Sequence, residues 1–174
     1  MTPDLAYPIG KFERPASSTS DDRAARVANL AALPPNLRGA LRGLSEAQID
    51  TPYRPGGWTV RQLVHHVADS HMQGYGRVKL ALTEANPVIK PYDEKAWAGL
   101  PDSMLPIELS LAILDGVHAR LDALLRSLTP EQFTRPFLHP ASGPMTIDIW
   151  CALYDWHSRH HTAHITMLRQ REGW

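Results

Sequence analysis

The sequence predicts an all-α protein with the architecture of a four-helix bundle. Four long segments carry apolar residues at the spacing of one helix face, and most of the fifteen prolines fall between these segments. No stretch shows the convincing alternation that is typical of strands. A chain of 174 residues, 43% hydrophobic and 21% charged, has the size and composition of one globular domain. We therefore expect four helices around a buried core.

The N-terminal part of the chain is predicted to be an extended arm followed by a helix. Residues 1–19 are rich in proline and serine and show no periodicity. Residues 20–22, Ser-Asp-Asp, offer an N-cap and acidic side chains that suit the positive end of a helix. Apolar residues at helical spacing then predict a helix through residues 27–44. The pair Pro34-Pro35 is expected to bend or break it, because proline lacks the N–H and clashes with the preceding turn.

The second helix has a clear start signal. A turn-forming loop, residues 51–57, is followed by Thr59 and Gln62, which have the spacing of a capping box. Apolar residues then continue to Leu82. Residues 85–106 contain four prolines and are predicted to be a long connection, a kind of segment that is often functional.

Two more helices complete the expected bundle. The third is predicted over residues 107–128 from its apolar periodicity, and the fourth over residues 146–171. Residues 129–145, between them, are rich in turn-forming residues and are predicted to be a connection.

Charge and cysteine content exclude several classes of protein. Basic and acidic residues number 18 each, so no basic excess points to nucleic acid or to an anionic membrane as a partner. No apolar run is long enough for a membrane span, and the first residues do not resemble a signal peptide. The lone cysteine, Cys151, permits no internal disulfide and is not expected to be a nucleophile. We therefore expect a cytoplasmic protein with a small-molecule substrate.

Histidines in the fourth helix carry the main functional signal. Four of the nine histidines fall within residues 156–165, and they form two i,i+4 pairs, His157/His161 and His160/His164. Such a pair sets two imidazoles on one face of a helix, where both can reach one metal ion.

A helical wheel favours one of the two pairs. Five residues define an apolar stripe on the fourth helix: Ile149, Leu153, Trp156, Ala163 and Met167. His160 and His164 lie roughly 30° and 70° from its centre, and His157 and His161 roughly 90° and 130°. The wheel therefore predicts that His160 and His164 point into the bundle and that the other pair flanks the site or faces solvent.

A third ligand must come from another part of the chain, because a catalytic zinc site usually has three protein ligands and an open position. The second helix offers His65, His66 and His71. His71 lies on the main apolar stripe of that helix, and the other two lie off it on opposite sides. Periodicity alone leaves the three candidates open.

The sequence resembles the DinB-like helical bundle superfamily, and within it the YfiT group of metal-dependent hydrolases and bacillithiol transferases. The segments that carry the resemblance run nearly end to end in the same order: Leu5-Ala6-Tyr7-Pro8-Ile9-Gly10, Asp50-Thr51-Pro52-Tyr53-Arg54, Gly56-Gly57-Trp58-Thr59-Val60-Arg61-Gln62, His65-His66-Val67-Ala68-Asp69-Ser70-His71-Met72, Lys90-Pro91-Tyr92-Asp93-Glu94-Lys95-Ala96-Trp97, His139-Pro140 and the stretch from Trp156 to Ile165. Together these segments are specific, whereas one i,i+4 histidine pair is not.

The resemblance implies a fold, a ligand set and an assembly. It implies that residues 1–174 form a single DinB-like metal-binding domain, with 1–19 as its arm, and that the helices run up-down-down-up. It implies the metal ligands His66, His160 and His164, which include the pair that the wheel favours. It also implies one divalent ion per chain, zinc or nickel, a homodimer, and bacillithiol as a possible thiol cosubstrate.

Further residues are candidates for contacts with the substrate or with the ligands. Tyr53 and Arg54 could bind an anionic group, or could form a surface turn with a salt bridge. Tyr92, Asp93 and Trp97 lie in a proline-bounded loop that could cover the metal, or be anchored in the core by its tryptophan. His157 would flank the site. Asp69 or Asp155 could orient a ligand imidazole, or be a solvated charge. Trp58 is expected to be a packing anchor.

The leading functional hypothesis is a metal-dependent enzyme. A divalent ion on three neutral imidazoles keeps its charge and open positions, so it can activate water for hydrolysis or a thiol for S-transfer. The resemblance favours a bacillithiol-type thiol S-transferase, with a hydrolase as the other enzyme version. The alternative is a non-catalytic, metal-binding stress-response bundle with a closed metal site.

Overall fold

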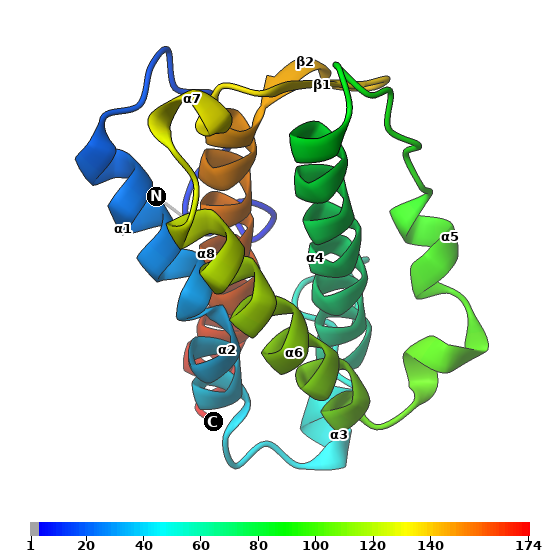
Figure 1. Cartoon of the computed structure of the whole chain (residues 1–174). Coiled ribbons are helices and arrows are strands. Elements are labelled where there is room, and N and C mark those ends of the chain that lie inside the picture. The colour runs from blue at the N-terminus through cyan, green and yellow to red at the C-terminus, as the bar shows by residue number, and fades with distance from the viewer. Residues whose placement is uncertain (1–3) are drawn as a thin grey trace.

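A computed structural model describes residues 4–174 and confirms the four-helix bundle (Figure 1). The first three residues of the predicted arm lie outside this range. The described elements, in chain order, are α1 (Ser20–Ala31), α2 (Leu33–Leu41), α3 (Glu46–Ile49), α4 (Val60–Thr83), α5 (Glu94–Ala98), the 3-10 helix η1 (Pro101–Met104), α6 (Ile107–Arg126), α7 (Pro130–Phe133), β1 (Pro136–His139), β2 (Gly143–Thr146) and α8 (Ile147–Glu172). None of the described helices is both long and apolar enough to cross a membrane.

The bundle has the up-down-down-up order that the resemblance implies. The pair α1/α2 and the helix α8 run in one direction, and α4 and α6 run in the other (Figure 1). Because α4 and α6 are parallel neighbours, the chain between them must travel back along the length of the bundle. Residues 84–106 make this return and carry α5 and η1 along one side (Figure 1). The long proline-rich connection is therefore a consequence of the topology.

Start and break signals read from the sequence lie close to the observed helix ends. Thr59 accepts a hydrogen bond from the Gln62 backbone and caps α4, as predicted. The first helix is capped one residue earlier than expected, by Thr19. The predicted break lies at Ala32, which ends α1 and caps α2, so that both prolines of the pair fall in the first turn of α2, where a missing N–H removes no helical hydrogen bond.

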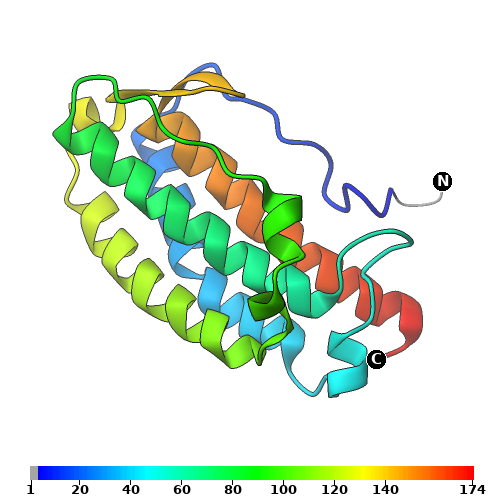
Figure 2. The ribbon, with the colours of Figure 1, turned by 90° about the vertical axis from the view of Figure 1, so that its right-hand side faces the viewer.

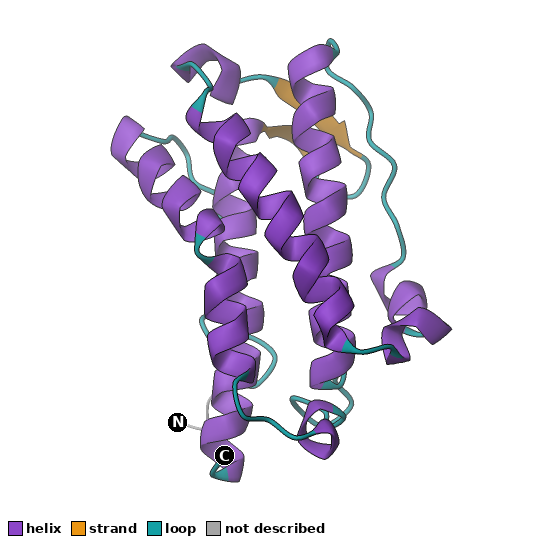
Figure 3. Ribbon diagram, turned by 60° about the horizontal axis from the view of Figure 1, so that its bottom comes forward, coloured by secondary structure: helices purple, strands orange, loops and turns teal. Residues whose placement is uncertain are grey.

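A β-hairpin departs from the expected connection between the third and fourth helices. Strand β1 pairs antiparallel with β2 across the end of the bundle, as the orange ribbons in Figure 3 show. The strands are four residues long and include Pro136, Gly143 and Pro144, which weaken any strand signal. Burial of Phe137 and Met145 holds the hairpin on the core. His139 accepts hydrogen bonds from two backbone N–H groups of the hairpin turn.

The N-terminal arm lies along α8. Figure 2 shows residues 4–19 as a blue trace running from the hairpin end of the bundle along the orange and red helix. The Trp156 indole donates a hydrogen bond to the Gly10 carbonyl at 3.1 Å, and Arg14 donates to the Pro144 carbonyl at 2.7 Å. The arm therefore covers a face of α8 that does not point to the other helices.

The interior of the bundle consists of two apolar clusters with a polar layer between them. One cluster surrounds Leu63, Leu114 and Ile165, and the other surrounds Val78, Leu121 and Trp150. On each long helix, the buried residues between the two clusters are mainly polar. We call these residues, together with the half-buried His157, the polar layer; the buried members are Ser70, His71, His118, Asp155, Ser158, His160, His161 and His164. Histidines of three helices thus meet at the middle of the bundle.

Helices α4 and α8 approach each other closely at Gly74. A Cβ atom at this position would lie 2.6 Å from two ring carbons of Tyr154. We expect Gly74→Ala to lower the free energy of unfolding by about 1–3 kcal/mol, the usual cost of overpacking. The matched control is Gly76→Ala on the same helix, where nothing lies within 4 Å. The control should raise the free energy of unfolding by roughly 0.5–1 kcal/mol. Urea denaturation measures both, and equal effects would contradict the prediction.

Candidate metal centre

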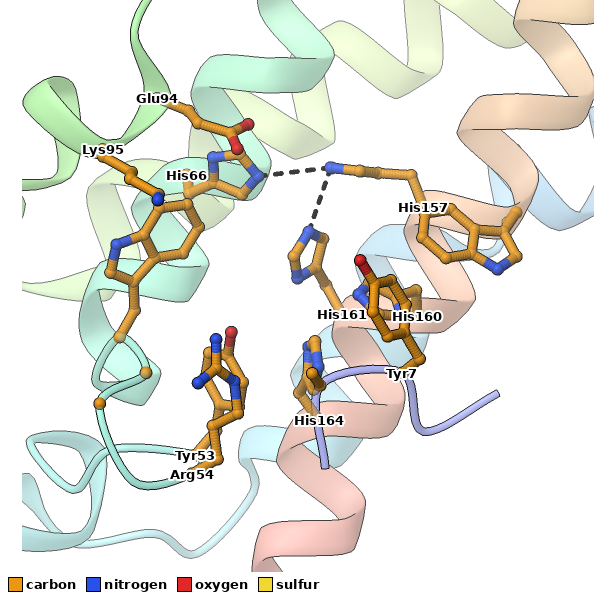
Figure 4. Close-up of a pocket in the computed structure, with 15 residues that line it drawn as sticks. Tyr7, Tyr53, Arg54, His66, Glu94, Lys95, His157, His160, His161 and His164 are labelled. Atoms are coloured by element: carbon orange, nitrogen blue, oxygen red, sulfur yellow. Dashed lines mark hydrogen bonds between the residues drawn. The ribbon is translucent and has the colours of Figure 1, made fainter. Parts of the chain in front are cut away.

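Three histidines from two helices point their Nε2 atoms at one another (Figure 4). His157 Nε2 lies 3.3 Å from His66 Nε2 and 3.1 Å from His161 Nε2. His66 comes from α4, and the other two are an i,i+4 pair of α8. One potential ligand atom from each residue lies within 4.8 Å of the other two. We call these residues the three-histidine cluster.

This arrangement fits a divalent cation. Two imidazoles that bind one zinc ion at about 2.0–2.1 Å have their nitrogen atoms roughly 3.0–3.4 Å apart, which is the separation seen here. Without a cation the contacts are poorly matched, because a neutral Nε2 is either a donor or an acceptor and that of His157 faces two others.

A second group adjoins the cluster. His160, His161 and His164 also bring one potential ligand atom each within 4.8 Å. The set that the resemblance implies, His66 with His160 and His164, does not form such a group among the described residues. The structure thus combines His66 with the other i,i+4 pair. Which set binds the metal stays a prediction for experiment.

The apolar stripe that the helical wheel predicted to point into the bundle is not the most deeply buried face of α8. The five residues of the predicted stripe are only half-buried, whereas the deeply buried residues of this helix form another stripe: Ile147, Trp150, Tyr154, Ser158, His161, Ile165 and Leu168. The N-terminal arm covers part of the predicted stripe, which is one reason for its apolar residues. For example, the ring centroids of Phe12 and Trp156 lie 6.1 Å apart. His161 therefore lies on the inward face.

His160 and His164 are also buried, but under other segments. Trp156 stacks on His160 with ring centroids 4.3 Å apart, and Tyr7 of the arm lies 6.0 Å from the same ring. Tyr53 stacks on His164 at 4.1 Å. These two imidazoles therefore form the wall of the site towards the arm and the loop before α4 (Figure 4).

Burial keeps the imidazoles neutral. It lowers the pKa of His66 to about 4, helped by the nearby His160. Burial likewise lowers the pKa of His160 and of His164 to about 4, and in His164 the neighbouring His160 adds to the effect. The pKa values of His157 and His161 are held well below the usual range by burial and by the neighbouring rings. Neutral imidazoles near pH 7 have free lone pairs, which a metal ion requires.

Comparison with known proteins identifies the family. The family model described as DinB superfamily matches residues 29–165. The chain belongs to the DinB superfamily. The chain is 52% identical over 171 residues to a protein of Bacillus mycoides (strain KBAB4) named "Putative metal-dependent hydrolase", with 98% of this chain and 99% of the relative covered. A protein of the same name from Bacillus cereus (strain B4264) is also 52% identical, with the same coverage.

Solved structures agree with this assignment. The chain matches YfiT from Bacillus subtilis with a TM-score of 0.95 and 49% identity, covering 98% of both chains; that protein is described as "a probable metal-dependent hydrolase with an unusual four-helix bundle topology". The four-helix bundle protein TT2238 matches with a TM-score of 0.58 and 22% identity over 87% of this chain and 99% of that chain, which shows the shared fold.

The three-histidine cluster opens into a chamber of about 640 Å³. Of the predicted substrate contacts, Tyr53, Arg54 and His157 line this chamber. Trp58, expected to be only a packing anchor, lines it as well, with its ring 4.6 Å from that of His66. The other lining residues are Ala6, Tyr7, Gly56, Gly57, His66, Glu94, Lys95, Trp156, His160, His161 and His164.

Two glycines shape the loop that carries these contacts. Gly56 has a φ of +67°, which side-chain-bearing residues rarely adopt. A Cβ atom on Gly57 would lie 2.8 Å from the Arg54 Cγ atom. The Gly-Gly pair thus lets the chain turn tightly enough for Tyr53 and Trp58 to face the chamber from both sides of the loop.

The predicted lid contributes different residues from those expected. Tyr92, Asp93 and Trp97 do not line the chamber. Asp93 instead caps α5 by accepting hydrogen bonds from two backbone N–H groups, and Trp97 packs on Tyr92 with ring centroids 4.5 Å apart. The chamber receives Glu94 and Lys95 from the first turn of α5 (Figure 4). The sequence Asp-Glu-Lys is typical of a helix start, so it could have predicted that Asp93 caps α5 instead of contacting the substrate.

Neither predicted carboxylate orients a ligand. Asp155 pairs with Arg159 at 3.0 Å, and no hydrogen bond among the described residues joins Asp69 to an imidazole. The His65 ring makes its hydrogen bonds away from the cluster. Its Nδ1 lies 2.7 Å from the Ser110 hydroxyl, and its Nε2 lies 3.0 Å from the Leu105 carbonyl oxygen. Burial raises the pKa of the Cys151 thiol far above its usual range, consistent with an inert residue.

Acid should destabilise the DinB fold through its buried histidines. Burial lowers the pKa of His118 from 6.5 to about 4. Between these values the unfolded chain binds a proton here that the folded chain excludes, so stability rises with pH by up to about 1 kcal/mol per pH unit. We expect His118→Gln to reduce this slope. Urea denaturation of the metal-free protein between about pH 4.5 and 6.5 measures it, and identical slopes would contradict the assignment.

Proposed function

We propose that the protein is a metal-dependent enzyme that holds one divalent ion on the three-histidine cluster. The convergence of three neutral Nε2 atoms at 3.1 and 3.3 Å carries the proposal. Zinc and nickel both suit imidazole ligands. When bound, such an ion lowers the pKa of a water molecule or thiol that joins it, which supplies a nucleophile near neutral pH. The names of the relatives as metal-dependent hydrolases agree with this use.

The chamber favours an acidic small molecule. Arg54 and Lys95 line it, and neither forms an ion pair with a carboxylate of residues 4–174. The Arg54 Nε atom is buried and has no hydrogen-bond partner among residues 4–174. Guanidinium groups bind carboxylates through paired hydrogen bonds, so Arg54 can hold an acidic group of the substrate. Among the described residues that line the chamber, the acidic one is Glu94, and it lies on the side of His66 (Figure 4).

These features support thiol transfer as the reaction. Bacillithiol, which the resemblance implies as cosubstrate, is an acidic thiol of a size that the chamber can hold. Its sulfur would form a bond to an electrophilic carbon as a leaving group departs, and the thiol proton would pass to solvent. Arg54 and Lys95 would hold the carboxylates, and the rings of Tyr53 and Trp58 would exclude water. Hydrolysis, the activity in the relatives' names, is the competing reaction.

A two-arm assay separates the reactions. In the first arm, zinc- or nickel-loaded protein receives bacillithiol and chlorodinitrobenzene, and conjugate and chloride are measured. In the second, it receives nitrophenyl esters without thiol. We expect conjugation that depends on metal and thiol, and that falls in Arg54→Gln more through KM than through kcat. Ester hydrolysis without conjugation would replace transfer by hydrolysis.

The non-catalytic alternative predicts a closed metal site. The cluster instead lines a chamber of about 640 Å³, a size typical of small-molecule sites, which favours an enzyme. The homodimer and the cytoplasmic location stay predictions; light scattering and cell fractionation test them.

A further inference from the structure

A row of three histidines crosses the polar layer from the metal centre into the core. His157 Nδ1 lies 3.3 Å from His71 Nε2, and His71 Nδ1 lies 3.0 Å from His118 Nε2. The three rings come from α8, α4 and α6. His71 is 0% exposed and His118 is 3% exposed. Two imidazoles this deep in a bundle are costly unless their nitrogen atoms are partnered.

The row has a direction. A neutral imidazole carries one N–H and one lone pair. Each contact in the row needs one donor and one acceptor. Consequently, the nitrogen that carries the proton on one ring determines which nitrogen carries it on the next. The whole row therefore has two possible arrangements of its protons, which we call its two orders.

A metal ion on the three-histidine cluster selects one order. It requires the lone pair of His157 on Nε2, which leaves the proton on Nδ1 to be donated to His71. His71 then carries its proton on Nδ1 and donates to His118, whose own proton also lies on Nδ1. His118 Nδ1 is buried and has no hydrogen-bond partner among residues 4–174, so the row ends at this ring.

We propose that His71 and His118 are positioning residues for the metal site, which hold His157 in the tautomer and orientation that present its Nε2 lone pair to the ion. The inference rests on the proposed function, because it takes His157 as a ligand. Metal-binding histidines usually donate their second N–H to a carboxylate, a carbonyl or water. Here an imidazole takes that place, and it orients the ligand without placing a negative charge in the core.

Zinc affinity of matched variants tests the row. Outer partners of metal ligands typically contribute about 10–100-fold to affinity. We expect a loss of this size in His71→Leu, and a partial recovery in His71→Gln, whose amide oxygen can accept from His157. The control is His65→Leu, which removes a buried imidazole of the same helix that is bonded to Ser110 and Leu105 instead. Competition with a chromophoric chelator measures each affinity, and the control should stay within about twofold of the wild type.

Nitrogen-15 NMR of the zinc-loaded wild-type protein provides a readout that needs no variant. We expect both His71 and His118 to carry the proton on Nδ1. Protonation of His71 on Nε2 would overturn the proposal, as would unchanged zinc affinity in a folded His71→Leu. If His157→Gln weakens zinc binding and His71→Leu does not, the positioning role of His71 and His118 is contradicted and the proposed metal site is supported. If His157→Gln leaves zinc binding intact, both fail.

Discussion

Replacing His157 with glutamine is expected to lower the affinity for zinc by more than about 100-fold, which exceeds the usual effect of residues around a ligand. The reason is the position of His157 Nε2, which faces both other members of the cluster at 3.1 and 3.3 Å. Glutamine keeps much of the volume but offers no imidazole nitrogen. His161→Gln and His66→Gln should have effects of similar size. Isothermal titration of the metal-free protein measures the affinity.

The matched control is His160→Gln. It also removes a buried imidazole of α8, but one that is stacked under Trp156. We expect it to lower zinc affinity by less than about tenfold, as a neighbour of the site rather than a ligand. In the reverse pattern, zinc affinity is lost on replacing His160 or His164 and kept on replacing His157 or His161. That result would establish the ligand set that the resemblance implies. If replacing any histidine of the polar layer abolished zinc binding, both proposed ligand sets would be contradicted.

Zinc should raise the melting temperature by about 10 °C. A ligand at about 1,000 times its dissociation constant stabilises the folded state by about 4 kcal/mol, and a protein of this size gains roughly 2–4 °C per kcal/mol. The cation replaces poorly matched contacts between neutral nitrogens, so its binding depends on the folded arrangement. Differential scanning calorimetry with and without a chelator measures the shift.

Two controls make this result specific. Magnesium prefers oxygen ligands and should leave the melting temperature unchanged. In the His157→Gln variant the same zinc concentration is at most about 10 times the dissociation constant, so the shift in melting temperature should fall to about 4 °C or less. A zinc-dependent shift of equal size in this variant would show that the stabilising ion lies elsewhere on the protein.

Most of the fold could be predicted from the sequence because its signals are local. The capping box of Thr59 and Gln62, the break near Pro34 and Pro35, and the four periodic segments all follow from backbone chemistry within a few residues. The hairpin before α8 could not be predicted in this way. Its strands are short, contain prolines, and are held by burial of Phe137 and Met145 against distant helices.

The site was predicted less completely, for a physical reason. A helical wheel assumes one buried face, whereas α8 is covered on two sides, by the bundle and by the arm. Both faces are apolar, and the sequence does not say which neighbour covers which. His66 was selected by resemblance, and the structure brings it to His157 and His161. Glu94 and Lys95 were missed because their place in the chamber depends on where α5 lies after the long return of the chain.

The polar layer has a consequence for how the helices align during folding. A helix that slipped by one turn, about 5.4 Å, would set the histidines of α8 against the leucines of one apolar cluster and leave their nitrogens without partners. Each buried polar group without a partner costs about 1–3 kcal/mol, so a slipped bundle would lose much of its stability. Uniformly apolar helices have no such penalty. The histidines that form the candidate metal centre therefore also fix the axial register of α4, α6 and α8.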